Sequence, residues 1–303
     1  MNKFQVQIIP ELLNLECNVR AINCFSFWDS KNRANFFSLN PRSPFQFKYF
    51  VRKEIEDPPK IATFRFSNLS YLRGKWFYHN KKGPLTLKFT IEENENLFLV
   101  NSLYHRLFVK VGCLEPTGNI LTDFITYKLE QVGMSYQVGS AGNIKGKTFL
   151  FFGGGYNFKT TLMSLILQNG GYYIGEEFFL LKGNNVFATI PNSHRFDFRN
   201  SHRSLFKFEI NKKRMEVSEY SYVIFLYYSD KDEIKEINLS EANHHLQLYH
   251  HTANTRYYKH FKTRDFLLGK KKKEKQILRN TDARYYLCYF TDIKKVFNFI
   301  NKK

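Results

Sequence analysis

The chain has 303 residues, of which 43% are hydrophobic, so it can bury a sizeable core in one large domain or in a main domain with a smaller partner. Its formal net charge is +19. Because the basic residues are spread through the chain, the charge favours a generally basic, solvated surface over a dedicated nucleic-acid surface. The four scattered cysteines contain no Cys-x-x-Cys pair, which indicates free thiols in a reducing compartment.

No targeting or membrane segment stands out. The first ten residues, Met1–Pro10, have one Lys and a short apolar stretch, unlike a secretory signal. No apolar run approaches the ~20 residues that span a bilayer. The sequence therefore predicts a cytoplasmic protein that makes no contact with a membrane.

Residues 1–116 are predicted to form a β-rich subdomain. Aromatic-rich runs alternate with turn signals such as Asp57-Pro-Pro and Lys81-Lys-Gly-Pro, and none carries a chemical motif. The predicted strands are Phe4–Ile9, Ile22–Trp28, Phe45–Val51, Ala62–Phe66, Trp76–His79, Leu85–Ile91, Leu97–Val100 and Arg106–Val111.

Residues 117–303 are predicted to mix strands and helices after the break at Pro116. Gly133 is expected to end the first helix, and Ser240 to cap a later one that starts near Glu241. The run Tyr220–Tyr228 is expected to be a central strand because it is long and almost wholly apolar. The other predicted elements are the helices Thr122–Val132, Leu162–Gln168 and Asp292–Ile300 and the strands Lys147–Phe152, Tyr172–Ile174, Phe178–Leu181, Val186–Ile190 and Arg284–Phe290.

A glycine-rich segment, Gly153–Thr161, joins the predicted strand Lys147–Phe152 to the next helix. It reads Gly-Gly-Gly-Tyr-Asn-Phe-Lys-Thr-Thr. Between a buried strand and a helix, such a turn binds phosphates with backbone N–H groups, while a Lys reaches the β- and γ-phosphates and a hydroxyl holds Mg²⁺. The segment fits G-x-x-x-x-G-K-[ST], except that Phe158 replaces the last glycine. The context favours a phosphate loop over an ordinary strand–turn–helix.

Two adjacent acids, Glu176 and Glu177, lie between the predicted strands that follow the loop. Beside a nucleotide, one carboxylate can hold Mg²⁺ and the other can accept the proton of an attacking hydroxyl. A solvent-exposed turn explains such a pair equally well when it stands alone, so the acids gain meaning only from the loop before them.

The stretch from about Met134 to Leu181 resembles the HPr kinase and phosphoenolpyruvate-carboxykinase-like family. That family has a strand, a glycine-rich P-loop ending in Lys-Ser/Thr, a helix, a Gly, a short strand, two adjacent acids and another strand. Here the series reads KTFLFFGGGYNFKTTLMSLILQNGGYYIGEEFFLL. The likeness implies an α/β (α+β) fold in which a phosphoenolpyruvate-carboxykinase-like P-loop domain, residues 117–303, follows the β-rich subdomain 1–116.

The resemblance also implies roles for single residues. Lys159, Glu176 and Glu177 would be catalytic, and Thr160 with Glu177 would hold Mg²⁺. The sequence departs from the family at Phe158, at Tyr156, and in having Glu where Asp is usual; Gln137 stands near the place of the family's upstream His. The residues expected to bind ATP are Gly153, Gly154, Gly155, Lys159, Thr160 and Thr161.

Weaker signals surround this motif. Arg195 and Arg199 fit substrate-binding residues around a transferred phosphoryl group as well as they fit a basic loop. The pairs His244-His245 and His250-His251 invite a metal interpretation, but a solvated helix is favoured because no carboxylate or Cys stands at ligand spacing. Lys270–Lys273 is most simply a solvated loop.

Three functions follow from these observations. The first is an ATP- and Mg²⁺-dependent kinase that transfers the γ-phosphoryl group to a hydroxyl, such as a Ser of a peptide or small protein. The second is a nucleotide- or phosphate-binding module that lacks turnover and acts through a protein partner. The third, a basic nucleic-acid-binding protein, rests on charge alone.

Overall fold

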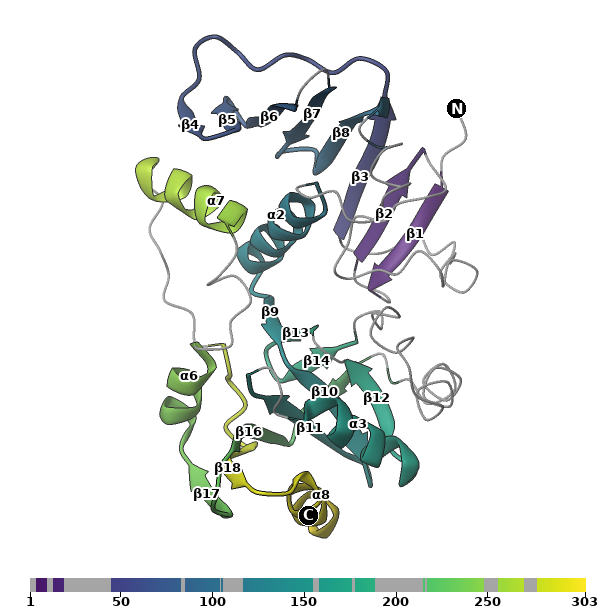
Figure 1. Cartoon of the computed structure of the whole chain (residues 1–303), viewed down its shortest axis with the longest axis vertical. Coiled ribbons are helices and arrows are strands. Elements are labelled where there is room, and N and C mark those ends of the chain that lie inside the picture. Colours follow the sequence, from purple (N-terminus) through teal and green to yellow (C-terminus); the bar gives the residue numbers. More distant parts are fainter. Residues whose placement is uncertain are drawn as a thin grey trace. The chain divides into compact units, whose positions relative to one another are not determined.

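The chain forms two compact units in a computed structural model (Figure 1). Unit 1 comprises Met1–Leu121 and Lys262–Leu268, and unit 2 comprises Thr122–Phe261 and Gly269–Lys303. Both mix helices and strands in an α+β arrangement. Within the described part of the chain, no helix has the length and apolar character needed to cross a membrane. The residues that the structure describes are 4–9, 13–18, 45–82, 85–103, 105, 117–154, 158–175, 178–188, 215, 217–247, 256–269 and 277–303.

Unit 1 contains an eight-stranded sheet in the order β1-β2-β3-β8-β7-β6-β5-β4. The pairs β2–β3 and β3–β8 are parallel, and the remaining neighbours are antiparallel. The strands are β1 (Phe4–Ile9), β2 (Leu13–Cys17), β3 (Phe45–Arg52), β4 (Phe64–Phe66), β5 (Leu69–Leu72), β6 (Lys75–Lys82), β7 (Leu85–Glu92) and β8 (Leu97–Asn101).

The sequence predicted six of these strands and missed β2 and β5. β2 reads LNLEC, without the β-branched or aromatic residues that mark strands, although four of its five residues are buried. The predicted strands Ile22–Trp28 and Arg106–Val111 lie outside the described residues.

A buried arginine stabilises the far end of this sheet. Arg264 is 1% exposed, and its guanidinium carbon lies 4.8 Å from the ring centre of Tyr71 and 5.4 Å from that of Trp76. Its Nη1 donates to Glu93 Oε2 at 2.7 Å, and Trp76 Nε1 donates to the other oxygen of that carboxylate at 2.8 Å. The segment Lys262–Leu268 is thereby fixed to β5, β6 and the turn after β7.

Replacing Arg264 with Ala is expected to lower the free energy of unfolding of unit 1 by about 3–5 kcal/mol, because the Glu93 carboxylate loses its buried cationic partner. Urea unfolding followed by Trp76 fluorescence in a Trp28→Phe background measures this, since Trp28 and Trp76 are the two tryptophans. Arg65→Ala is the control, because the exposed Arg65 makes hydrogen bonds only at the surface. Equal losses in both variants would contradict the assignment.

Unit 2 is built on a six-stranded sheet, β12-β10-β11-β16-β18-β17, and a four-stranded sheet, β15-β14-β13-β9. Strand β16 lies between β11 and β18 and is parallel to both, which confirms it as a central strand. The strands are β9 (Ser135–Val138), β10 (Ser140–Ile144), β11 (Lys147–Phe152), β12 (Tyr172–Gly175), β13 (Phe178–Lys182), β14 (Asn185–Phe187), β15 (Val217–Glu219), β16 (Tyr222–Tyr228), β17 (Glu233–Ile237) and β18 (Arg284–Phe290).

The helices of the chain begin and end with identifiable signals. The first ends at Gly133, which has a φ of +84°, as expected from the sequence. Asn238 rather than Ser240 caps α6: its Oδ1 accepts from Glu241 N at 2.9 Å while Glu241 Oε2 accepts from Asn238 N, a reciprocal capping box. The helices are α2 (Thr117–Gln131), α3 (Lys159–Gln168), α6 (Leu239–Gln247), α7 (Arg256–Leu267) and α8 (Ile293–Lys302).

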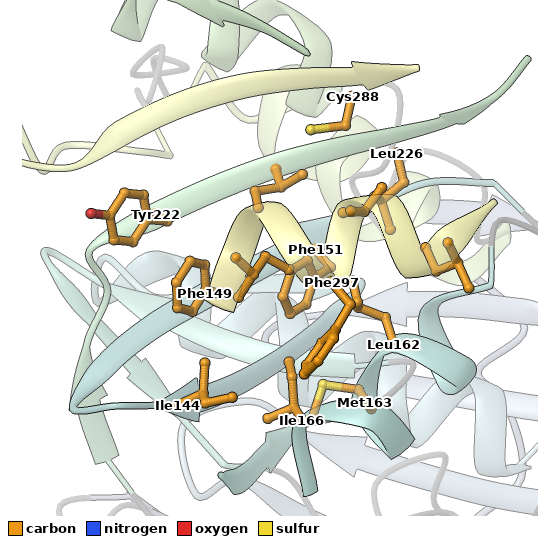
Figure 2. Close-up of a cluster of buried hydrophobic side chains, with 14 of the residues drawn as sticks. Ile144, Phe149, Phe151, Leu162, Met163, Ile166, Tyr222, Leu226, Cys288 and Phe297 are labelled. Carbon is orange, nitrogen blue, oxygen red and sulfur yellow. The ribbon is translucent and has the colours of Figure 1, made fainter. Parts of the chain in front are cut away.

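The six-stranded sheet separates two apolar cores. Side chains that alternate along β11 and β16 point to opposite faces, so Phe151 and Leu226 join one core while Phe152 and Phe225 join the other. Helices α3 and α8 cover the first face, where Leu162, Met163 and Phe297 meet the strands (Figure 2). Helix α6 covers the second face through Ala242 and Leu246.

Helix α3 lies very close to the sheet. A Cβ added at Gly142 of β10 would stand 2.7 Å from Met163 Cε and 3.3 Å from the Tyr172 carbonyl oxygen. The absence of a side chain at Gly142 therefore lets α3 pack against β10, and this packing positions the start of α3 relative to the end of β11.

Candidate functional site

The three parallel strands β11, β16 and β18 end at the same edge of the sheet, which we call the carboxyl edge. In open α/β sheets ligands bind outside this edge, where the connecting segments leave the strands. β11 runs into Gly153 and Gly154, β16 runs into Ser229–Asp232, and β18 runs into Thr291 and Asp292. The glycine-rich segment thus begins at the edge of the sheet where a ligand site is expected.

Lys159 is the first residue of α3, and its side chain turns back over the glycines. Its Nζ donates to the carbonyl oxygens of Gly153 at 2.6 Å and Gly154 at 2.8 Å. Gly153 is buried, and Gly154 is exposed. The ammonium group therefore lies directly above the start of the glycine-rich segment, where it can meet an anion.

The first turn of α3 carries no negative charge. Its N-cap residue, Phe158, makes no side-chain capping hydrogen bond, and the first turn contains no acidic residue. The Leu162 amide bonds backward to the Phe158 carbonyl oxygen at 2.9 Å. Thr160 and Thr161 are exposed in this first turn, and the partial positive charge of a helix N-terminus attracts anions.

Phe158 has a left-handed backbone conformation, which favours glycine. Its φ of +53° and ψ of +23° are left-handed, a region that costs an ordinary residue about 1–2 kcal/mol. The ring lies against Tyr228 and Phe290, with ring centres 5.9 Å and 6.3 Å away. Those residues end β16 and β18, so the ring lies at the carboxyl edge, where Phe158 remains 45% exposed.

Comparing Phe158→Gly with Phe158→Ala isolates the cost of the left-handed backbone from the contribution of the ring contacts. Both changes remove the ring, and only Gly relieves the left-handed strain. The Gly variant is expected to be more stable than the Ala variant by about 1 kcal/mol. Hydrogen exchange at the buried Ile166 amide of α3 measures the opening free energy in each variant. Equal protection in the two would show that the turn relaxes and stores no strain.

The remaining residues of the predicted site lie outside the described part of the chain. These are Gly155, Glu176, Glu177, Arg195 and Arg199. The two acids join β12, an outer strand of the six-stranded sheet, to β13 of the four-stranded sheet. Of the predicted nucleotide-binding set, the structure therefore brings Gly153, Gly154, Lys159, Thr160 and Thr161 together at the end of β11.

Other polar groups at the carboxyl edge were not expected from the sequence. Asp232 accepts hydrogen bonds from Thr291 N at 2.8 Å and from Lys295 Nζ. The bond from Lys295 is the main cause that lowers the pKa of Asp232 below its usual value. His245 of α6 lies on the other face of the sheet, with Nδ1 3.0 Å from the Tyr227 hydroxyl. Its partner stands 18 residues earlier, so sequence spacing gave no signal of the pair.

No protein-family model matches the chain, and no curated protein matches it. Among solved structures the chain is similar to the structure of the Hpr(Ser) kinase/phosphatase from Coxiella burnetii. That similarity covers 55% of this chain and 95% of the other, at 8% identity and a TM-score of 0.31. A likeness this distant supports no conclusion about activity, so the family resemblance of the sequence stays a prediction.

Proposed function

We propose that the chain binds a nucleoside triphosphate, ATP being the expected one, with the segment from Gly153 to Thr161. The observation that carries the proposal is the position of Lys159 at the N-terminus of α3, where its ammonium donates to the carbonyl oxygens of Gly153 and Gly154. A cation, the amides of a helix N-terminus and an adjacent hydroxyl at the carboxyl edge of a parallel sheet are the groups that bind the phosphates of a nucleotide.

In this proposal a Mg²⁺ ion accompanies the nucleotide. Thr160 is exposed in the first turn of α3 and would supply a hydroxyl ligand, as Ser or Thr does beside a P-loop lysine. Glu177 would supply a carboxylate oxygen, the kind of ligand that Mg²⁺ prefers. Such an ion neutralises phosphate charge when it is bound.

The proposed activity is a kinase that transfers the γ-phosphoryl group of ATP to a hydroxyl, such as a Ser of a peptide or small protein. Phosphoryl transfer needs mainly positioning and charge neutralisation, and Lys159 with the α3 amides supplies both for the phosphates. In this proposal Glu176 and Glu177 serve the metal and the reacting hydroxyl, while Arg195 and Arg199 bind around the transferred group.

One observation favours a second candidate, a module that binds nucleotide without turnover. Phe158 stands where the P-loop pattern has glycine, and its ring lies against Tyr228 and Phe290. A bulky side chain at that position can leave phosphate binding intact and still prevent transfer. The two candidates share the nucleotide site and differ only in transfer.

Replacing Lys159 with Ala is expected to weaken binding of Mg·ATP about 10- to 100-fold, because charged hydrogen bonds contribute about 1.5–3 kcal/mol each. Isothermal titration calorimetry measures the change. Lys182→Ala is the matched control, because it removes the same positive charge from an exposed side chain far from the site. Lys182 lies in a hairpin whose Asn184 carbonyl accepts from Tyr220 N. Tyr220 stands just before β16 begins, so this hairpin lies at the edge of the sheet opposite the carboxyl edge. Equal affinity in wild type and the Lys159 variant would reject the site.

If the chain is a kinase, replacing Glu176 or Glu177 with Gln is expected to lower phosphoryl transfer at least about 100-fold. Transfer is measured as radiolabelled γ-phosphate that passes to acceptor peptides. Both variants should still bind ATP. Binding is checked by calorimetry in the same variants. Binding by the wild type together with no transfer to any hydroxyl acceptor, water included, would reject the kinase and retain the binding module.

A further inference from the structure

Strand β10, which pairs with β11, presents a hydroxyl to the face of the sheet that α3 covers. Ser140 is the first residue of β10 and pairs in register with Phe151 of β11. Residues directly opposite each other on antiparallel strands point to the same face of a sheet. Phe151 belongs to the core beneath α3, together with Met163 (Figure 2). The side chain of Ser140 therefore also faces α3.

Two close approaches show the direction in which α3 runs along β10. A Cβ added at Gly142 would stand 2.7 Å from Met163 Cε. One added at Gly171 would stand 2.5 Å from the Asn143 carbonyl oxygen and 2.8 Å from the Ile166 carbonyl oxygen. The order of residues in α3 thus follows the order in β10, and both elements lead away from the carboxyl edge.

Ser140 therefore lies beneath the first turn of α3. It stands two residues before Gly142, which is about 7 Å nearer the carboxyl edge by the rise of a strand. Lys159 stands four residues before Met163, which is about 6 Å nearer the same edge by the rise of a helix. Because Met163 contacts the place of Gly142, the start of α3 at Lys159 comes to the height of Ser140.

The hydroxyl of Ser140 is buried without a partner. Ser140 is 0% exposed, and its Oγ has no hydrogen-bond partner in the part of the chain that the structure describes. A buried hydroxyl without a hydrogen bond costs free energy, so at a binding site it calls for a partner that arrives on binding. Thr90 of β7 has an unpaired buried hydroxyl as well, so burial alone does not mark a site. The place of Ser140 beside Lys159 does.

Strand pairing connects the segment around Ser140 to the segment that contains the two acids of the proposed site. Two antiparallel pairs join these segments, one on each side of Ser140: Val138 with Phe178, and Ala141 with Gly175. Two residues separate the pairs on each segment, Gly139 and Ser140 on one and Glu176 and Glu177 on the other. Counted from either pair, the position of Ser140 corresponds to that of Glu176.

We propose that Ser140 is a positioning residue of the nucleotide site, and that its hydroxyl donates to the carboxylate of Glu176 when the nucleotide binds. The inference rests on the proposed function. A hydrogen bond from a hydroxyl to an ionised carboxylate is stronger than one between neutral groups. This bond holds Glu176 beside Lys159 and the phosphates, and it serves a kinase and a binding module alike.

A double-mutant cycle on binding of Mg·ATP tests the pair. Ser140→Ala is expected to weaken binding about 10-fold, because one hydrogen bond to a charged group is lost. In a Glu176→Ala background the same change is expected to have no effect, because the acceptor of that bond is already gone. Isothermal titration calorimetry of the four proteins measures both comparisons.

The stability of the protein without nucleotide separates positioning from a structural role. Because the described part of the chain gives the Ser140 hydroxyl no partner, Ser140→Ala should leave the opening free energy of α3 unchanged or raise it. Hydrogen exchange at the Ile166 amide measures this. Thr90→Val is the matched control, since it removes the unpaired buried hydroxyl of β7 in unit 1, and it should bind Mg·ATP like the wild type.

The outcomes distinguish this inference from the function beneath it. A wild-type protein that fails to bind Mg·ATP contradicts the proposed nucleotide site, and the inference falls with it. Equal affinity in wild type and Ser140→Ala contradicts the inference alone. So does a 10-fold effect of Ser140→Ala that persists in the Glu176→Ala background, because the partner is then another group. A loss of affinity matched by a loss of stability without nucleotide would make Ser140 a structural residue.

Discussion

The parallel pairing of β11 with β16 is the constraint on which the rest of unit 2 depends. Its register sets Phe149 beside Tyr222 and Phe152 beside Phe225, and so fixes where β11 ends relative to its neighbour. Because β18 is parallel to β16 as well, three strands end at one edge. The glycine-rich segment, the aromatic cover of Phe158 and the His245–Tyr227 pair all take their positions from this edge.

The turn at Phe158 shows how packing and backbone preference oppose each other at the site. The left-handed conformation before Lys159 favours glycine, and the chain has the bulky residue Phe158 there. The ring contacts with Tyr228 and Phe290 oppose this strain, although Phe158 remains 45% exposed. The side chain therefore lies at the surface beside the ends of β16 and β18.

Sequence reasoning succeeded where a single local property decides the structure. β11 was predicted because KTFLFF is a short, nearly continuous apolar run, and α8 because its buried residues recur every three or four positions. It failed at β10, whose residues SAGNI have low strand propensity and are buried because Gly142 admits the close approach of α3. Helix α7 was missed because its basic and aromatic residues show no simple period.

The site was predictable only in part, for physical reasons. Lys159, Thr160 and Thr161 belong to the same short segment as the glycines, so their closeness to Gly153 and Gly154 is a local property that spacing reveals. The capping box of α6 could also be predicted, because Asn238 and Glu241 stand three residues apart. The prediction of Ser240 as the cap was wrong. The contact of His245 with Tyr227 depends on how α6 folds back on the sheet, and no local pattern encodes that.

The central claim is that the backbone at the start of α3 binds phosphate. The most direct measurement is a two-dimensional amide NMR titration of the full chain with Mg·ATP. The account predicts that the largest shift changes fall on the amides of Gly153, Gly154, Lys159, Thr160 and Thr161. Shift changes confined to other parts of the chain, or none at saturating nucleotide, would contradict it.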